Sequence, residues 1–252
     1  MKKLRIILLL AAISVSGFFA EPGACAGDAG MFSYGAEVDY NSKYIWHGIL
    51  YSDDPVLQPS VWVSALDFTF TVWNNFETAE KFNETDFSLG YSRQAGKFLL
   101  EPTLSMFTYY NQADGGSLLE LSAKITHPLY KDFSVYTLQN FYFLGGDIGD
   151  SYFGGLGINF ETALTGSLNF NATPFIGWGS SKYNHENFSA PETFYLNRWA
   201  LNLFSFDAAL EYTLPGGWYI KPHYTFAVIS DKTFTKNNKN NSSVGAALGR
   251  EF

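Results

Sequence analysis

Residues 32–40 read FSYGAEVDY, and this stretch decides the fold class. Large or apolar residues at the even positions alternate with small or polar residues at the odd positions. Residues 218–228, WYIKPHYTFAV, repeat the same alternation near the other end of the chain. A period of two over nine or more residues predicts a β-strand with one apolar and one polar face. Helical spacing is not sustained anywhere beyond the first 26 residues.

Working outward from these two stretches, the alternation predicts about twelve strands, and the chain is therefore expected to be all-β. The predicted strands cover residues 32–40, 56–65, 67–76, 84–93, 97–109, 117–127, 132–143, 151–161, 166–178, 200–213, 217–229 and 243–252. Most have close to the roughly 9–11 residues that a tilted strand needs to cross a bilayer. A globular protein has strands of about 5–6 residues on average.

The connections between these strands alternate between long and short. The long ones cover residues 41–55, 77–83, 110–116, 144–150, 179–199 and 230–242, whereas turns such as Gln94-Ala95-Gly96 are tight. Outer-membrane barrels have this asymmetry, with long extracellular loops and short periplasmic turns. The pattern predicts a closed antiparallel transmembrane β-barrel whose two ends are both periplasmic.

The first 26 residues have the features of a cleaved signal peptide. Lys2, Lys3 and Arg5 precede an apolar run over residues 6–20, and Ala24-Cys25-Ala26 supplies a small-x-small cleavage site. The alternative is a membrane anchor, but the run is shorter than the roughly 20 residues that a spanning helix needs. We therefore expect a signal peptide over residues 1–26, export through the Sec pathway, and a single barrel domain over residues 27–252.

The composition of the expected mature chain excludes several classes of function. Its only cysteine, Cys25, leaves with the leader, and its four histidines lack metal-ligand spacing, so no metal or other cofactor is expected. Without the leader, 13 basic residues face 23 acidic ones, which argues against nucleic acid as a partner. Aromatic residues make up 18% of the chain, yet its mean hydropathy is only −0.06. A barrel with aromatic girdles in lipid and a polar interior has this combination.

The polar face of each strand is expected to point into the lumen. This assignment predicts a set of pore-lining residues: Glu37, Asp39, Asp86, Glu101, Glu120, Lys124, Glu161, Asp207, Glu211, Lys221 and His223. Carboxylates in a pore concentrate cations, so we expect a weak cation preference. The alternative is a filled interior in which the charges pair and leave no path.

One stretch resembles a known family. The run Ser42-Lys43-Tyr44-Ile45-Trp46-His47-Gly48-Ile49, followed by Asp53-Asp54-Pro55, is similar to the N-terminal region of TorF-type porins. That family typically has Arg where this chain has His47, which puts any role of the Arg in doubt. The resemblance covers about 20 residues; it implies an outer-membrane channel of unassigned substrate and no catalytic residues.

Two loops contain residues whose role the sequence leaves open. Tyr44 and Trp46 are expected to anchor the first loop at the outer aromatic girdle, with Gly48 permitting a tight turn, and a ligand site is the alternative. The long loop over residues 179–199 is rich in aromatic residues, which either fold inward as a constriction or decorate the surface. The residues concerned are Tyr183, His185, Phe188, Phe194, Tyr195 and Trp199.

The sequence thus predicts an outer-membrane porin-like channel for passive diffusion of small solutes in a Gram-negative cell, and not an enzyme. Its expected partners are membrane lipid, small solutes, and the barrel-assembly machinery, which recognises a terminal aromatic residue such as Phe252. One alternative is a barrel with an adhesive or scaffold role. A lipid hydrolase is the other, but it needs a Ser–His pair, and the sequence contains no His-x-Ser motif.

Overall fold

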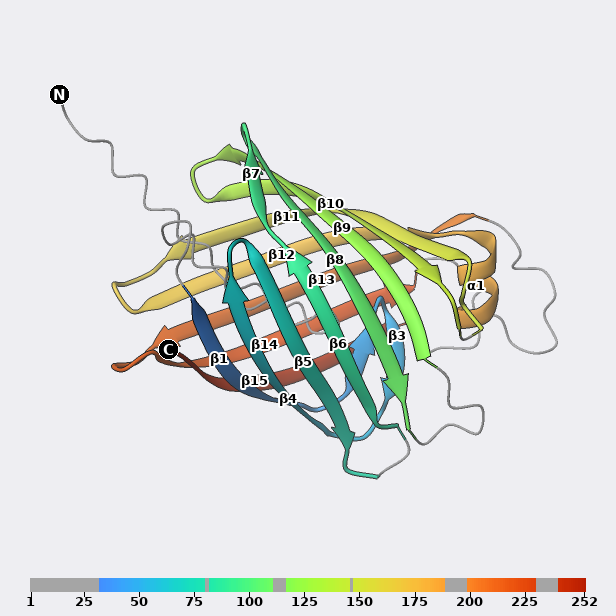
Figure 1. The fold of residues 1–252 in the computed structure, drawn as a ribbon, viewed down its shortest axis with the longest axis horizontal. Coiled ribbons are helices and arrows are strands. Elements are labelled where there is room, and N and C mark those ends of the chain that lie inside the picture. The colour runs from blue at the N-terminus through green and yellow to red at the C-terminus, as the bar shows by residue number, and fades with distance from the viewer. Residues whose placement is uncertain (1–31, 80–81, 111–116, 146, 189–198, 230–239) are drawn as a thin grey trace.

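The wall of the molecule is one closed antiparallel sheet, seen in a computed structural model that describes residues 32–79, 82–110, 117–145, 147–188, 199–229 and 240–252 (Figure 1). Its strands are β1 (Ser33–Asn41), β4 (Val56–Ala65), β5 (Phe68–Glu77), β6 (Glu84–Tyr91), β7 (Arg93–Ala95), β8 (Phe98–Tyr109), β9 (Ser117–Tyr130), β10 (Phe133–Phe143), β11 (Ser151–Ala163), β12 (Leu168–Gly179), β13 (Ala200–Thr213), β14 (Trp218–Ile229) and β15 (Asn240–Glu251). The expected signal peptide lies outside the described residues.

Closure follows from the pairing at two seams. The first wall strand β1 pairs with the last, β15, from Gly35↔Glu251 to Asn41↔Gly245. Strands β6 and β7 are two parts of one wall strand, and both pair with β8. The sheet therefore has twelve wall strands and no free edge, as the sequence predicted.

Long connections lie at one end of the barrel, which we call the long-loop end, and short ones lie at the other, the short-turn end. Figure 1 shows the start of β1 and the end of β15 near the label C, at the end of the barrel opposite α1. Tight turns form where local conformation allows: Leu66 and Asp67 both have positive φ between paired Ala65 and Phe68, as a type I′ hairpin turn requires.

The outer surface of the wall is apolar and graded along the barrel axis. Many exposed aliphatic side chains lie in its middle, and many exposed aromatic side chains lie near each end. The aliphatic set includes Val38, Val61, Leu104, Leu121 and Leu156; the aromatic sets include Phe68, Phe98, Phe133, Tyr212 and Trp218 near the short turns, and Tyr40, Phe76, Tyr110, Phe141 and Trp199 near the long loops. This is the pattern of a lipid-facing band between two girdles.

Three further elements lie outside the wall sheet. Strands β2 (Tyr44–Trp46) and β3 (Ile49–Ser52) form a hairpin in the first long connection, and helix α1 (Ser181–Phe188) follows β12. The sequence predicted none of these three elements. No helix of the described chain is long and apolar enough to span a membrane.

Candidate functional site

The inner face of the wall carries the predicted charged side chains. Six of the eleven are buried (Glu37, Asp39, Asp86, Glu120, Asp207 and Lys221), and five are half-buried (Glu101, Lys124, Glu161, Glu211 and His223). All eleven lie on the inner face because the alternation in sequence matches the pleat of each strand. The buried acids Asp86 and Glu120 lie toward the long-loop end, and Glu101, Lys124, Glu161 and Glu211 lie toward the short-turn end.

Two of the acids lie against basic side chains on a neighbouring part of the wall. The Lys221 ammonium lies 2.9 Å from Oε2 of Glu37, which also accepts a 2.7 Å hydrogen bond from the Tyr219 hydroxyl. The His223 Nε2 atom lies 2.9 Å from Oδ1 of Asp39. These pairs link β14 across β15 to β1, so they also brace the seam where the barrel closes.

Some of the other inner-face acids accept a hydrogen bond from a nearby hydroxyl, and some have a buried oxygen that accepts none. The Thr225 hydroxyl donates to Asp207 at 2.6 Å. The Tyr44 hydroxyl donates to Glu84 at 3.1 Å. Within the described part of the chain, Oδ1 of Asp86 and Oε2 of Glu120 are buried without a hydrogen-bond partner.

Glu84 is an inner-face acid that the sequence analysis missed. It is the first residue of β6 and is only 3% exposed. Its position two residues before Asp86 was the available signal, because residues two apart in a strand share a face.

Toward the short-turn end the lumen is less crowded. Glu101 lies directly opposite Lys124 in the β8–β9 register, and the Lys124 ammonium lies 5.3 Å from the centre of the Tyr136 ring. Glu161 and Glu211 are half-buried on β11 and β13, with β12 between them. These charged side chains keep part of their surface exposed, and we call this half of the lumen the vestibule.

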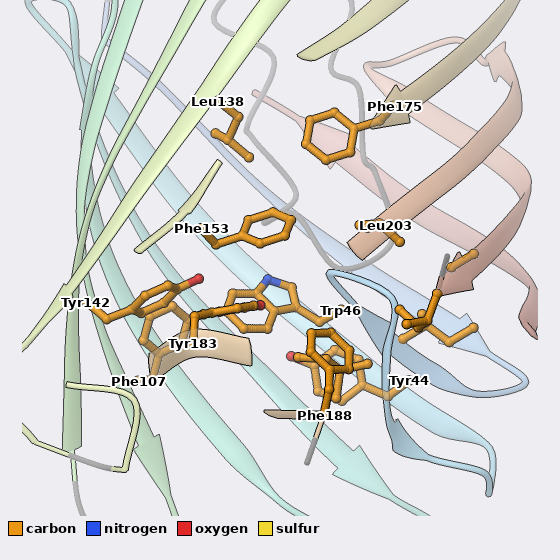
Figure 2. Packing of buried hydrophobic residues seen from close by; sticks show 14 of the residues in the cluster. Tyr44, Trp46, Phe107, Leu138, Tyr142, Phe153, Phe175, Tyr183, Phe188 and Leu203 are labelled. Carbon is orange, nitrogen blue, oxygen red and sulfur yellow. The ribbon is translucent and has the colours of Figure 1, made fainter. Parts of the chain in front are cut away.

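The long-loop half of the lumen is filled by the β2–β3 hairpin. Tyr44, Ile45, Trp46 and Ile49 are each at most 7% exposed and belong to one buried apolar cluster with side chains of the wall. Figure 2 shows Trp46 in the middle of this cluster, among Tyr142, Phe153, Tyr183 and other rings. The centre of the Trp46 ring system lies 6.0 Å from those of Phe107 on β8 and Tyr142 on β10.

His47 forms the tip of the hairpin together with Gly48. Its imidazole is stacked between Trp46 and Phe153, with ring centres 3.9 Å and 4.0 Å away. Nδ1 lies 3.1 Å from the Tyr183 hydroxyl, and Nε2 lies 3.3 Å from the Asn140 amide nitrogen. Because the ring is only 3% exposed, burial lowers the pKa of His47 well below its ordinary value.

Helix α1 covers the hairpin from the loop between β12 and β13. The Ser180 hydroxyl accepts a 3.3 Å hydrogen bond from the Tyr183 backbone N–H, which caps the first turn. Tyr183 and Phe188 are fully buried, and the Tyr183 ring centre lies 5.1 Å from that of Phe153. This long loop therefore does fold inward through α1, whereas Trp199 is exposed and Phe194 and Tyr195 lie outside the described residues.

The prediction that Tyr44 and Trp46 anchor the first loop at the outer girdle is wrong. Both side chains point into the lumen and pack against the wall from inside. Two apolar triplets, Tyr44-Ile45-Trp46 and Ile49-Leu50-Tyr51, flank the dipeptide His47-Gly48, which is a hairpin signal. That pattern was the available signal for a hairpin, which the sequence analysis missed, and it does not indicate the side of the wall on which the hairpin packs. The tight turn expected at Gly48 is present, with φ of 77°.

The fold has counterparts among solved structures. An outer-membrane channel from Pseudomonas putida F1 superposes with a TM-score of 0.51 over 90% of this chain and 98% of that one, at 11% identity. The chain has the fold of an outer-membrane β-barrel. This barrel is also similar to the porin NanC (TM-score 0.48, 12% identity, 87% and 98% coverage) and to the translocator domain of the autotransporter NalP from Neisseria meningitidis (0.48, 13%, 90% and 90%).

Comparison by sequence adds no family to this barrel. No protein-family model matches the chain, and no curated protein sequence matches it. The TorF-type resemblance of the segment around His47 is not confirmed and stays a prediction.

Proposed function

We propose that the chain is a porin-like channel of a Gram-negative outer membrane, through which small solutes diffuse passively. The observation that carries the proposal is the contrast between the two faces of a closed wall. The outer face presents aliphatic and aromatic side chains over its whole circumference, whereas the inner face presents carboxylates, amides and hydroxyls beside the rings that enclose the hairpin. An apolar surface of this extent needs lipid around it, and a polar interior of this kind holds water.

We further propose that the lumen prefers cations weakly. Each of the three inner bases lies beside an acid: Lys221 beside Glu37, His223 beside Asp39, and Lys124 opposite Glu101. Acids nevertheless outnumber bases among the predicted inner-face residues, and two of these acids, Glu161 and Glu211, keep part of their surface exposed. Excess carboxylates along a water-filled path concentrate cations.

The filled long-loop half of the lumen favours one competing function, that of a barrel that carries no solute. The β2–β3 hairpin and α1 fill the long-loop end with aromatic rings, which suits a scaffold or an adhesin as well as a closed channel. An enzyme has less support, because the surroundings of His47 and His223 are those of structural histidines. His47 is enclosed by aromatic rings, and His223 is paired with Asp39.

Planar-bilayer recording in a salt gradient tests the channel and its selectivity together. The refolded barrel is expected to give discrete conductance steps, with a reversal potential on the cation side of zero. A reversal potential on the anion side would refute the cation preference. A folded barrel that stays silent even when residues 44–51 are replaced would refute the channel and support the non-transport role, and hydrolysis of lipid acyl chains by purified protein would support the enzyme.

A further inference from the structure

The β2–β3 hairpin reaches across the lumen and touches the wall on several sides. Tyr44 packs on Trp73 of β5, Trp46 on Phe107 of β8, and His47 on Phe153 of β11. On the opposite side, the Asn241 amide of β15 donates to the Gly48 carbonyl at 3.2 Å. An element that meets the wall in so many directions occupies the cross-section of the barrel at this level.

The tip of the hairpin fits closely against β13 and β14. A methyl group added at Gly48 would lie 2.6 Å from a Leu203 methyl and 2.8 Å from an Ile229 methyl. His47 and Gly48 both have positive φ, 49° and 77°, so the two-residue turn is tight. The tip is therefore held by shape and aromatic stacking.

The base of the hairpin is tied to the barrel rim by hydrogen bonds. The Ser42 and Ser243 hydroxyls lie 3.2 Å apart, the Lys43 backbone N–H donates to Ser243, and the Ser52 hydroxyl donates to Glu77. The chain joins the base of the hairpin directly to β1 and β4, whereas the tip is held by non-covalent contacts. A segment fixed at its base and seated by non-covalent packing at its tip has the construction of a hinged element.

We propose that the β2–β3 hairpin is a reversible plug, which closes the long-loop end of the lumen when seated and leaves its seat when solute passes. The proposal rests on the channel function proposed above. His47 and Gly48 are the seating residues, and α1 holds the plug from the loop side through Tyr183. The vestibule at the short-turn end stays open in both states.

The substitution Gly48→Ala tests the plug against a matched control. Gly48 and Gly96 both have positive φ, but nothing lies within 4 Å of a methyl group added at Gly96. Both variants thus strain a turn, and only Gly48→Ala also places a methyl group against the Leu203 and Ile229 side chains that seat the tip. A second variant replaces residues 44–51 by two glycines, which leaves the β1–β4 pairing from Asn41↔Val56 onward in place. Retention of fast migration in unboiled gels identifies the folded barrels.

We expect Gly48→Ala and the loop replacement to raise the fraction of time spent conducting by about tenfold or more. The added methyl group overpacks the seat of the tip, and the loop replacement removes the hairpin itself. Gly96→Ala is expected to conduct like the unmodified barrel. Equal conductance in all four folded proteins would overturn the plug and leave the channel function standing. Silence of the folded loop-replacement variant would overturn the channel function, and the plug with it.

Discussion

His47 is the residue at which the segment around it departs from the family that this segment resembles. TorF-type porins typically have Arg at the matching position, and Arg stays charged at any accessible pH. Here a histidine lies buried between two aromatic rings, where only the neutral form avoids a desolvation cost. The residue at the tip of the proposed plug is thus one whose pKa burial lowers well below its ordinary value.

Acidification is expected to unseat the hairpin. Burial lowers the pKa of His47 when the plug is seated, and an unseated His47 in water has its ordinary value of about 6.5. Only the unseated state binds a proton between those two values, so seating is fully favoured above about pH 6.5 and weakens as the pH falls. The fraction of time that the barrel spends conducting should therefore rise as the pH falls from about 8 to about 5.

The matched variant for this titration is His47→Asn, since Asn also tolerates positive φ. It should lose the response. The titratable groups that contact the His47 ring are the Tyr142 and Tyr183 hydroxyls. Their ordinary pKa of about 10 lies outside the range from pH 8 to pH 5. Glu120 is hydrogen-bonded to Tyr142, and a parallel Glu120→Gln variant separates its titration from that of His47. An undiminished response in His47→Asn would contradict the assignment.

The buried Glu37–Lys221 pair makes a second prediction at this scale. Lys221→Met leaves Glu37 buried at 4% exposure with the Tyr219 hydroxyl as its remaining donor. Removing one partner of a buried ion pair costs about 3–5 kcal/mol, so the variant should unfold at a clearly lower urea concentration. Glu37→Gln combined with Lys221→Met should recover much of the loss. A double variant less stable than Lys221→Met alone would show that the pair acts differently.

At the scale of elements, the wall strands were predictable and the contents of the lumen were not. The two-face alternation of a wall strand is local in sequence, so each of the twelve could be found from its own residues. The positions of the β2–β3 hairpin and α1 depend on distant rings such as Phe107, Tyr142 and Phe153, which no local pattern reveals. Glu84 was missed for a local reason: it is the first residue of β6, where the alternation only begins.

The last strand carries a prediction about assembly. Phe252 stacks on Tyr34 of β1 with ring centres 5.0 Å apart, and its backbone N–H donates to the Tyr34 carbonyl at 2.9 Å. Deleting Phe252 should lower the amount of folded barrel recovered from outer membranes, through the loss of this contact and of the proposed assembly signal. Phe252→Tyr serves as the control and should assemble normally. Equal recovery of the deletion variant would contradict a role for the terminal ring.

At the scale of the whole molecule, selectivity should depend on the open vestibule. Glu161 and Glu211 are half-buried and remain accessible, whereas Glu120 lies deeper and Glu101 faces Lys124. The double variant Glu161→Gln/Glu211→Gln should therefore move the reversal potential toward zero more than Glu101→Gln/Glu120→Gln does. A larger shift from the second pair would place the selective region nearer the plug.

The proposed channel function depends most on the division of each wall strand into a lipid-facing and a water-facing side. The mature chain is expected to lack cysteine, so single cysteines at Thr103 and Leu104 of β8 can be spin-labelled after refolding into lipid vesicles. Collisions with oxygen report lipid, and collisions with a water-soluble nickel complex report water. We predict oxygen access at Leu104 and nickel access at Thr103; equal access at both positions would contradict the account.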